Sequence, residues 1–148
     1  FAGWVAGKIS DKAGRKPMIA LGGFSSRLAG IALPFAADFG QAWLILPIQS
    51  LGFSIVRPGQ HALLADLAPA KTRGRIFGLY GTFFGVGDII GPIIGAHLYS
   101  VYRFETFQIA NFTIPGYGIP FFVTGLSGLI SIIILLVFVK EPEHAQKK

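Results

Sequence analysis

Three ionisable side chains lie inside long apolar stretches of the sequence, where a charged group is costly to bury. They are Arg27, Arg57 and Asp88. A carboxylate in such surroundings can exchange a proton or bind a cation, and a nearby guanidinium can balance its charge. We therefore expect Asp88 to be a coupling site for protons or cations, with an arginine as its partner.

The depths of these three groups support a common site. Counted at about 1.5 Å per helical residue from the basic ends of their stretches, Asp88 lies roughly 18 Å deep, Arg27 roughly 14 Å and Arg57 roughly 12 Å. Pro92 adds a feature, because proline has no N–H and so frees the backbone carbonyl of Asp88. The alternative is a static bridge from Asp88 to Arg57 or Arg27 that only fixes helix packing.

A polar, helix-breaking run, Arg57-Pro58-Gly59-Gln60, precedes His61. Gln49 lies loosely on the same helical side as Arg57. We expect Gln49, Arg57 and His61 either to face a solute or to form hydrogen bonds between helices, and the sequence does not decide between these roles.

Motifs for catalysis are not present in the sequence. It has no Cys, and nothing in it resembles a catalytic triad, a phosphate-binding loop or a nucleotide site. An intramembrane enzyme would need paired acids, a histidine cluster or an activated serine, whereas Asp88 is the one acid deep in an apolar stretch. We therefore expect neither enzymatic activity nor a cofactor or metal.

The composition indicates which elements position these groups. Of the 148 residues 52% are hydrophobic and 14% charged, and the mean hydropathy is +0.60, which excludes almost any water-soluble domain. Four stretches are long enough to cross a bilayer as helices, which takes about 20 residues. The sequence predicts one all-α, polytopic transmembrane helix bundle, in which the spans are 18–37, 42–65, 76–99 and 119–139. We expect residues 1–7 to be the end of a fifth helix that begins upstream, 100–118 to be a long turn-rich loop, and 140–148 to be a polar cytoplasmic tail.

The basic residues gather on one side of these spans. Four spans and one helix end make the loops alternate in side, so ten of the thirteen Lys and Arg residues share a side. These ten are Lys8, Lys12, Arg15, Lys16, Lys71, Arg73, Arg75, Lys140, Lys147 and Lys148. By the positive-inside rule this side is cytoplasmic. The charge orients a multi-pass protein of the cell membrane in its lipid bilayer and does not indicate a nucleic-acid binder.

The first cytoplasmic loop carries the most specific motif, G-x-x-x-D-K-x-G-R-K. Its residues are Gly7, Asp11, Lys12, Gly14, Arg15 and Lys16. An acid at Asp11 suits a neighbouring helix N-terminus, and Gly14 permits a tight turn. This loop resembles the signature loop of the major facilitator superfamily of secondary transporters.

Two further segments are similar to motifs of that family. Asp66 ends a span and precedes a P…RG…G connection that contains Arg73, and Gly87, Gly91, Pro92 and Gly95 form a G-x-x-x-G-P-x-x-G run. The family's version of the run, reported for antiporter branches, ends in a further Gly where this chain has Ala96. The glycine spacing predicts close helix packing, and the packed seam can also rock during transport.

The resemblance implies part of a twelve-helix fold, in which two six-helix halves open and close around a central solute site. The chain would then run from the end of the eighth helix to the twelfth, or from the end of the second to the sixth. We expect the first of these, the C-terminal half, because only nine residues follow the last span. The resemblance also favours Arg57 over the more peripheral Arg27 as the partner of Asp88. At the cytoplasmic end we expect Asp66 to pair with Arg15 or Lys12 and hold an inner gate.

The expected function is transport of a small solute by alternating access, driven by a proton or cation gradient, together with the remaining helices of the transporter. The sequence does not identify the solute, and it does not decide among symport, antiport and uniport. The alternative is a non-transporting assembly or receptor module of the membrane. Such a module would explain the hydropathy and the charge asymmetry, but not the signature-like loop or the charges at mid-membrane.

Overall fold

The computed structural model describes residues 15–109 and 112–139, most of which form four long helices. These are α2 (Arg15–Ala32), α3 (Phe39–Leu67), α4 (Arg73–Tyr102) and α5 (Ile119–Phe138), and a 3₁₀ turn, η1 (Leu33–Phe35), extends α2. All four are long and apolar enough to cross a membrane. The predicted all-α bundle of four spans is confirmed. The expected helix end at 1–7 and the tail at 140–148 lie outside the described residues.

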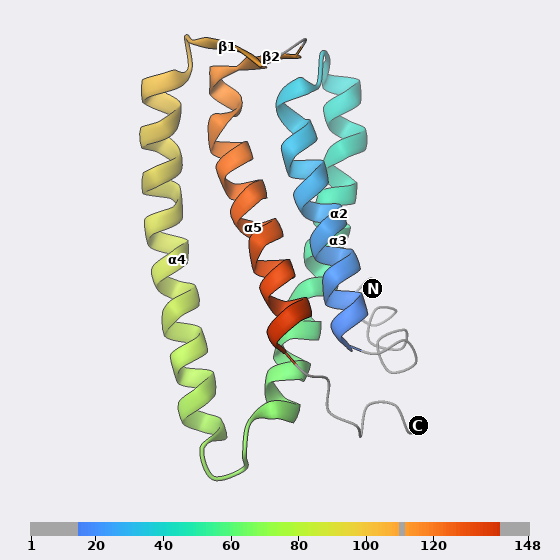
Figure 1. Cartoon of the computed structure of the whole chain (residues 1–148), viewed down its shortest axis with the longest axis vertical. Helices are drawn as coiled ribbons and strands as arrows, with labels where there is room; N and C mark the ends of the chain where they lie inside the picture. Colours follow the sequence, from blue (N-terminus) through green and yellow to red (C-terminus); the bar gives the residue numbers. More distant parts are fainter. Residues whose placement is uncertain (1–14, 110–111, 140–148) are drawn as a thin grey trace.

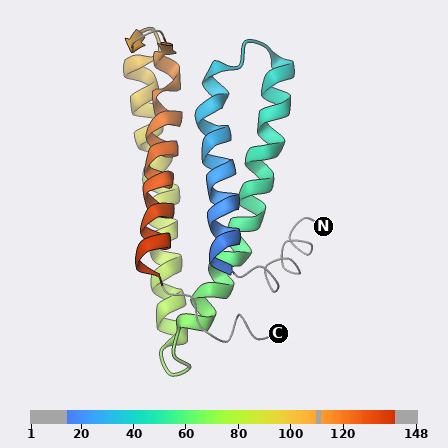
Figure 2. The ribbon, with the colours of Figure 1, turned by 45° about the vertical axis from the view of Figure 1, so that its right-hand side comes forward.

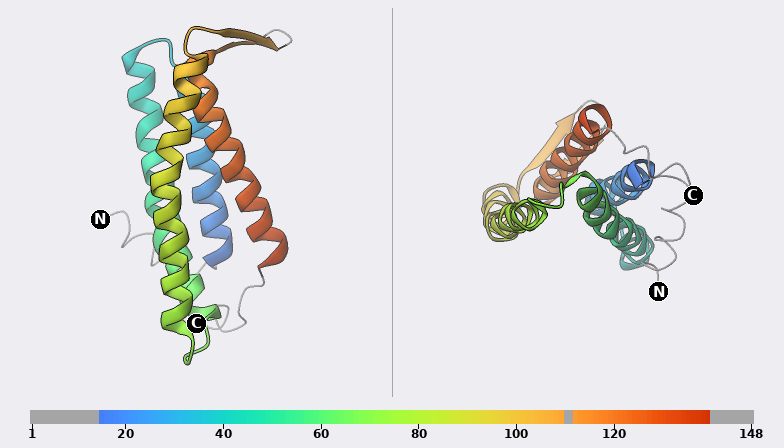
Figure 3. Two further views of the ribbon diagram at one scale, coloured as in Figure 1. Left: turned by 90° about the vertical axis from the view of Figure 1, so that its left-hand side faces the viewer. Right: turned by 90° about the horizontal axis from the view of Figure 1, so that it is seen from below.

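The helices run roughly side by side as a bundle (Figure 1). Two antiparallel pairs are visible in Figure 2, α2 beside α3 and α4 beside α5. The most extensive contact joins α2 to α3, and α2 also packs on α5, whereas α4 packs mainly on α5. Viewed from below in Figure 3, the short connection at the lower end leads from α3 across to α4. The bundle thus has a closely packed side, α2 with α3 and α5, and a looser side at α4.

Small residues allow α2 and α3 to approach each other closely. A Cβ atom at Gly52 would lie 2.5 Å from the carbonyl oxygen of Gly22 and 2.7 Å from the Cβ of Ser26. Ser26 is 1% exposed, and its hydroxyl donates to the carbonyl of Gly23 at 2.9 Å. Backbone contact of this kind is a common way for helices to associate in a bilayer. The hydrophobic effect contributes little there, because lipid tails are as apolar as the side chains.

The turn between α2 and α3 is closed by side chains. Asp38 caps α3 by accepting a hydrogen bond from the backbone N–H of Gln41 at 2.8 Å, and the Gln41 side chain accepts from the backbone N–H of Ala37 at 2.9 Å. This reciprocal pair is similar to a capping box and satisfies donors at the start of the helix.

The segment between α4 and α5 differs from the turn-rich loop that the sequence predicted. It contains an antiparallel hairpin of β1 (Thr106–Ile109) and β2 (Phe112–Pro115), followed by a 3₁₀ turn, η2 (Gly116–Gly118). A side chain at Gly116 would collide with the carbonyl oxygen of Tyr102. The Tyr117 hydroxyl donates to the carbonyl of Pro34 at 3.0 Å. The hairpin segment therefore links the outer ends of α4, α5 and α2.

The glycine-rich helix α4 is not packed as the sequence suggested. No residue of α4 is buried, and among the described residues nothing lies within 4 Å of a Cβ placed at Gly87, Gly91 or Gly95. The predicted glycine seam is therefore not formed with α2, α3 or α5, and it stays a prediction. Gly87 lines the cavity between the helices, and none of the other three helices closely approaches these glycines.

Candidate functional site: a cavity between the four helices

A cavity of about 830 Å³ lies between the helices and draws its lining from all four of them. Arg27 enters from α2, Arg57 and Gln60 from α3, and Asp88 from α4. The helix α5 contributes Thr124, Ser127, Gly128 and Ser131. The three charged groups that the sequence singled out by depth therefore share one space.

The predicted bridge between Arg57 and Asp88 is not formed in this structure. Among the described residues, neither Arg57 nor Arg27 has a nitrogen within 4.0 Å of the Asp88 carboxylate. The guanidinium of Arg57 instead lies over the ring of Phe84, with its Cζ 4.9 Å from the ring centroid. Phe84 lies one helical turn before Asp88, so it takes the arginine on the same side of α4. The direct neighbour of the Arg57 guanidinium is therefore the Phe84 ring and not the Asp88 carboxylate.

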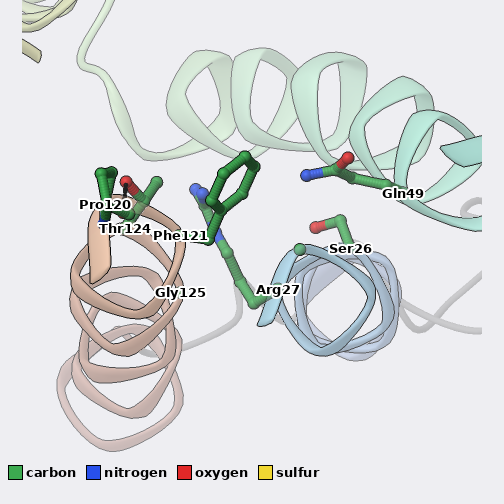
Figure 4. A pocket seen from close by; sticks show the side chains of 8 residues that line it. Ser26, Arg27, Gln49, Pro120, Phe121, Thr124 and Gly125 are labelled. Carbon is green, nitrogen blue, oxygen red and sulfur yellow. Dashed lines mark hydrogen bonds between the residues drawn. The ribbon is translucent and has the colours of Figure 1, made fainter. Parts of the chain in front are cut away.

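Arg27 has a similar aromatic neighbour and a larger role in the cavity system. Its guanidinium lies over Phe53 of α3, at 5.1 Å from the ring centroid. It is half-buried and lines the central cavity, a second one of about 230 Å³ and a third of about 80 Å³. In Figure 4 its side chain extends from α2 across the space between α2 and α5. The side chain thus stands where the three cavities meet.

A row of small polar residues on α5 faces the central cavity and went unnoticed in the sequence. Thr124, Ser127, Gly128 and Ser131 recur at helical spacing within a stretch whose other residues are mostly large and apolar. Each of the three hydroxyls donates to a backbone carbonyl of its own helix, at 2.8 to 3.0 Å. Their oxygens are left to accept hydrogen bonds from the cavity. The spacing of three and four residues was the signal that could have identified this face.

Two of the expected site residues lie away from the central cavity. Gln49 lines the 230 Å³ cavity (Figure 4). Its amide nitrogen lies 3.0 Å from the position of a Cβ atom at Gly30. His61 is exposed, lines none of the three cavities, and packs edge-on against Tyr80 of α4 at 5.3 Å between ring centroids. Its neighbour Gln60 accepts a hydrogen bond from the Tyr80 hydroxyl at 3.2 Å. In this structure His61 contributes to interhelical packing.

The expected pair of Asp66 with Arg15 is present. Arg15 at the start of α2 and Asp66 at the end of α3 form an ion pair with 2.5 Å between Nη1 and Oδ2. Lys16 donates to the carbonyl of Leu136 in the last turn of α5 at 2.7 Å, where helix carbonyls lack intrahelical partners. Arg73 is exposed at the start of α4. The remaining residues of the predicted gate, Gly7, Asp11, Lys12 and Gly14, lie outside the described residues.

The family follows from a comparison with known proteins. The family model described as Major Facilitator Superfamily matches residues 1–148, the whole chain. The chain belongs to the major facilitator superfamily. The resemblance of its motifs is thereby confirmed, and the four spanning helices are those of an integral membrane protein of this family.

Similar members of the major facilitator superfamily include three resistance proteins. Multidrug resistance protein 3 of Bacillus subtilis is 29% identical over 62% of the chain and 18% of its own length. Quinolone resistance protein NorA of Staphylococcus aureus is 24% identical over 94% of the chain and 32% of its own length. Tetracycline resistance protein, class H, of Pasteurella multocida is 28% identical over 96% of the chain and 32% of its own length. The chain thus spans at most about a third of these relatives, and no solved structure matches it.

Proposed function

We propose that the protein containing this chain is a secondary transporter of the cell membrane, which moves small organic solutes by alternating access and couples their movement to a proton or cation gradient. The observation that carries the proposal is the central cavity, in which Asp88 and two arginines face one space inside a bundle of spanning helices. Ionisable groups inside the membrane region of a transporter typically mark ion and substrate paths.

The surroundings of Asp88 support a coupling role over a static bridge. Among the described residues no cation lies within 4.0 Å of its carboxylate, so no ion pair has to break before a proton binds. Pro92 leaves the carbonyl of Asp88 without its helical donor, which adds a backbone oxygen for a cation at the same depth. Arg57 and Arg27 share the cavity and can balance the carboxylate through the space between them.

The class of solute is inferred from the cavity and the relatives. A volume of about 830 Å³ lies within the range of about 300–1,000 Å³ that small-molecule pockets occupy. Two of the relatives are named for quinolone and tetracycline resistance. We infer that the solutes are compounds of that size with apolar ring systems, and a quinolone and a tetracycline are the first probes to use.

The test is Asp88→Asn in the complete protein, reconstituted in liposomes. A coupling role predicts that accumulation of the probe driven by a proton gradient is lost, while exchange of labelled for unlabelled probe continues. Asp88→Asn combined with Arg57→Gln is the control. If the double variant regains accumulation, or if the single variant keeps it, Asp88 only fixes helix packing and the coupling proposal is wrong.

If the wild-type protein moves no solute in either assay, the transport proposal fails as a whole. A membrane assembly or receptor module would then be the better explanation of the four helices.

A further inference from the structure

Among the described residues, the charges that line the central cavity do not cancel. Two guanidinium groups, of Arg27 and Arg57, face one carboxylate, of Asp88. Each guanidinium lies over a phenylalanine ring, Phe53 or Phe84, and not beside an acid. A cation–aromatic contact is weaker than a charge-assisted bond to a carboxylate, so each guanidinium keeps most of its capacity to bind an anion.

Arg27 and Arg57 differ in what can neutralise them. Arg57 is exposed and lies over Phe84, one helical turn from Asp88 on the same helix. Arg27 is half-buried, and within residues 15–109 and 112–139 no carboxylate lies within 4.0 Å of it. A buried cation without an anion is costly in a membrane. The surplus positive charge of the cavity is therefore concentrated at Arg27.

The Arg27 side chain lies against a glycine of α5 that leaves space for it. A Cβ atom at Gly128 would overlap the Nε and Cδ atoms of Arg27 and lie 2.7 Å from its Cζ. One turn earlier, a Cβ at Gly125 would overlap Ile31 and does not approach the guanidinium. Gly128 thus provides a gap through which Arg27 crosses from α2 to the wall of the cavity, and Gly125 offers a matched comparison.

We propose that the solute of this cavity carries a carboxylate or similar planar anionic group on an aromatic body, and that Arg27 selects it. A guanidinium binds a carboxylate through two parallel hydrogen bonds, which favours this anion over a point charge of another shape. Phe53 and Phe84 offer ring faces and edges to the aromatic body. The proposal rests on the proposed transport function and adds the chemical class of its solute.

The test compares two probes that differ in charge but share a ring system, 2-naphthoate and 2-naphthamide. Binding of each to the complete protein is measured by equilibrium dialysis, with no ion gradient. We expect the wild type to bind the naphthoate at least about tenfold more tightly, the scale of one charge-assisted pair. Arg27→Gln removes that preference by weakening naphthoate binding more than naphthamide binding, and Arg27→Lys retains part of the preference.

The two glycines provide a test that does not remove the arginine. Gly128→Ala displaces the guanidinium, so it also lowers naphthoate binding, whereas Gly125→Ala retains the preference. If Arg27→Gln does not fold, the comparison of Gly128→Ala with Gly125→Ala tests whether Arg27 selects the anion.

The inference is wrong if the wild type binds naphthamide as tightly as naphthoate, if it binds neither probe, or if Arg27→Gln or Gly128→Ala keeps the wild-type preference. Coupling does not enter a measurement without a gradient. A protein that accumulates solutes but does not prefer the anion overturns this inference and leaves the proposed function standing.

Discussion

At the scale of single residues, an arginine's role here depends on what lies within a few ångströms of its guanidinium. Arg57 rests on Phe84, Arg27 crosses to α5 through the gap at Gly128, and Arg15 pairs with Asp66. The first two line the central cavity, and the third joins the start of α2 to the end of α3. One residue type therefore lines a cavity in two places and joins two helix ends in a third.

The ion pair between Arg15 and Asp66 leads to a prediction about the transport rate. The side chains of Arg15 and Asp66 are 24% and 33% exposed, and such partly exposed pairs contribute about 0–1 kcal/mol to stability. We expect Arg15→Gln and Asp66→Asn each to change the thermal stability little. If the pair holds a gate, the two changes are strongly non-additive in the transport rate of the complete protein.

The measurement is a double-mutant cycle of that rate, with Arg75→Gln as a control at an exposed basic residue on the same side of the membrane. Additive effects of Arg15→Gln and Asp66→Asn on the rate would show that the pair has no gating role.

Sequence reasoning placed the charged residues but not their partners. Depth along a helix follows from counting residues, so the sequence alone is enough to assign Arg27, Arg57 and Asp88 to neighbouring depths. The direction of a long side chain depends on its rotamer and on the gaps its neighbours leave. The positions of Arg57 over Phe84 and of Arg27 at Gly128 depend on such gaps, which the sequence does not show, and the Arg57–Asp88 pair is not formed in this structure.

At the scale of elements, glycines act in two different ways. Gly22 and Gly52 lie where the backbones of α2 and α3 meet, whereas the glycines of α4 contact nothing within 4 Å among the described residues. Similar glycine content thus accompanies a tight contact in one place and an open face in the other. The sequence predicts that glycines recur on a helix face, but which face meets a neighbour depends on the other helices.

Gly52→Ala tests the contact between α2 and α3. A methyl group there would lie 2.5 Å from a carbonyl oxygen of Gly22, so the helices have to separate. Overpacking of this kind costs about 1–3 kcal/mol, and we expect a lower melting temperature of the complete protein in detergent. Gly74→Ala, in the first turn of α4 with nothing within 4 Å among the described residues, is the control and should leave the temperature close to that of the wild type. Equal melting temperatures for the two variants would mean that the close approach is not required.

The connection between α4 and α5 is the part of the secondary structure that the sequence did not predict. The four helices were predictable because about 20 apolar residues in a bilayer have few alternatives to a helix. The hairpin at 106–115 was not, because its strands have four residues each and pair only with each other. The position of such a short strand pair depends on the contacts around it. Here these contacts are the close approach at Gly116 and the hydrogen bond from the Tyr117 hydroxyl to the carbonyl of Pro34.

At the scale of the whole molecule, the four helices form an incomplete enclosure. No residue of α4 is buried, and Asp88 is exposed although it lines the central cavity. The chain spans between 18% and 32% of the length of its resistance-protein relatives. We infer that further helices of the same protein cover α4 and complete the walls of the cavity.

This inference predicts that residues 1–148 by themselves do not transport. Liposomes that contain only this chain should take up a quinolone or tetracycline no faster than empty liposomes, because a cavity open to lipid cannot alternate its access. Liposomes that contain the complete protein are the positive control. Uptake by residues 1–148 alone, at a rate comparable to that of the complete protein, would contradict the incomplete enclosure.

Coupling of solute movement to a proton at Asp88 can be measured as proton flux. The complete protein is reconstituted in liposomes that hold a pH-sensitive dye, and a solute gradient is applied with no pH gradient. We expect a solute-dependent change in internal pH for the wild type and none for Asp88→Asn, although the variant still exchanges solute. Solute movement by the wild type without proton flux, or an equal flux in Asp88→Asn, would contradict this coupling.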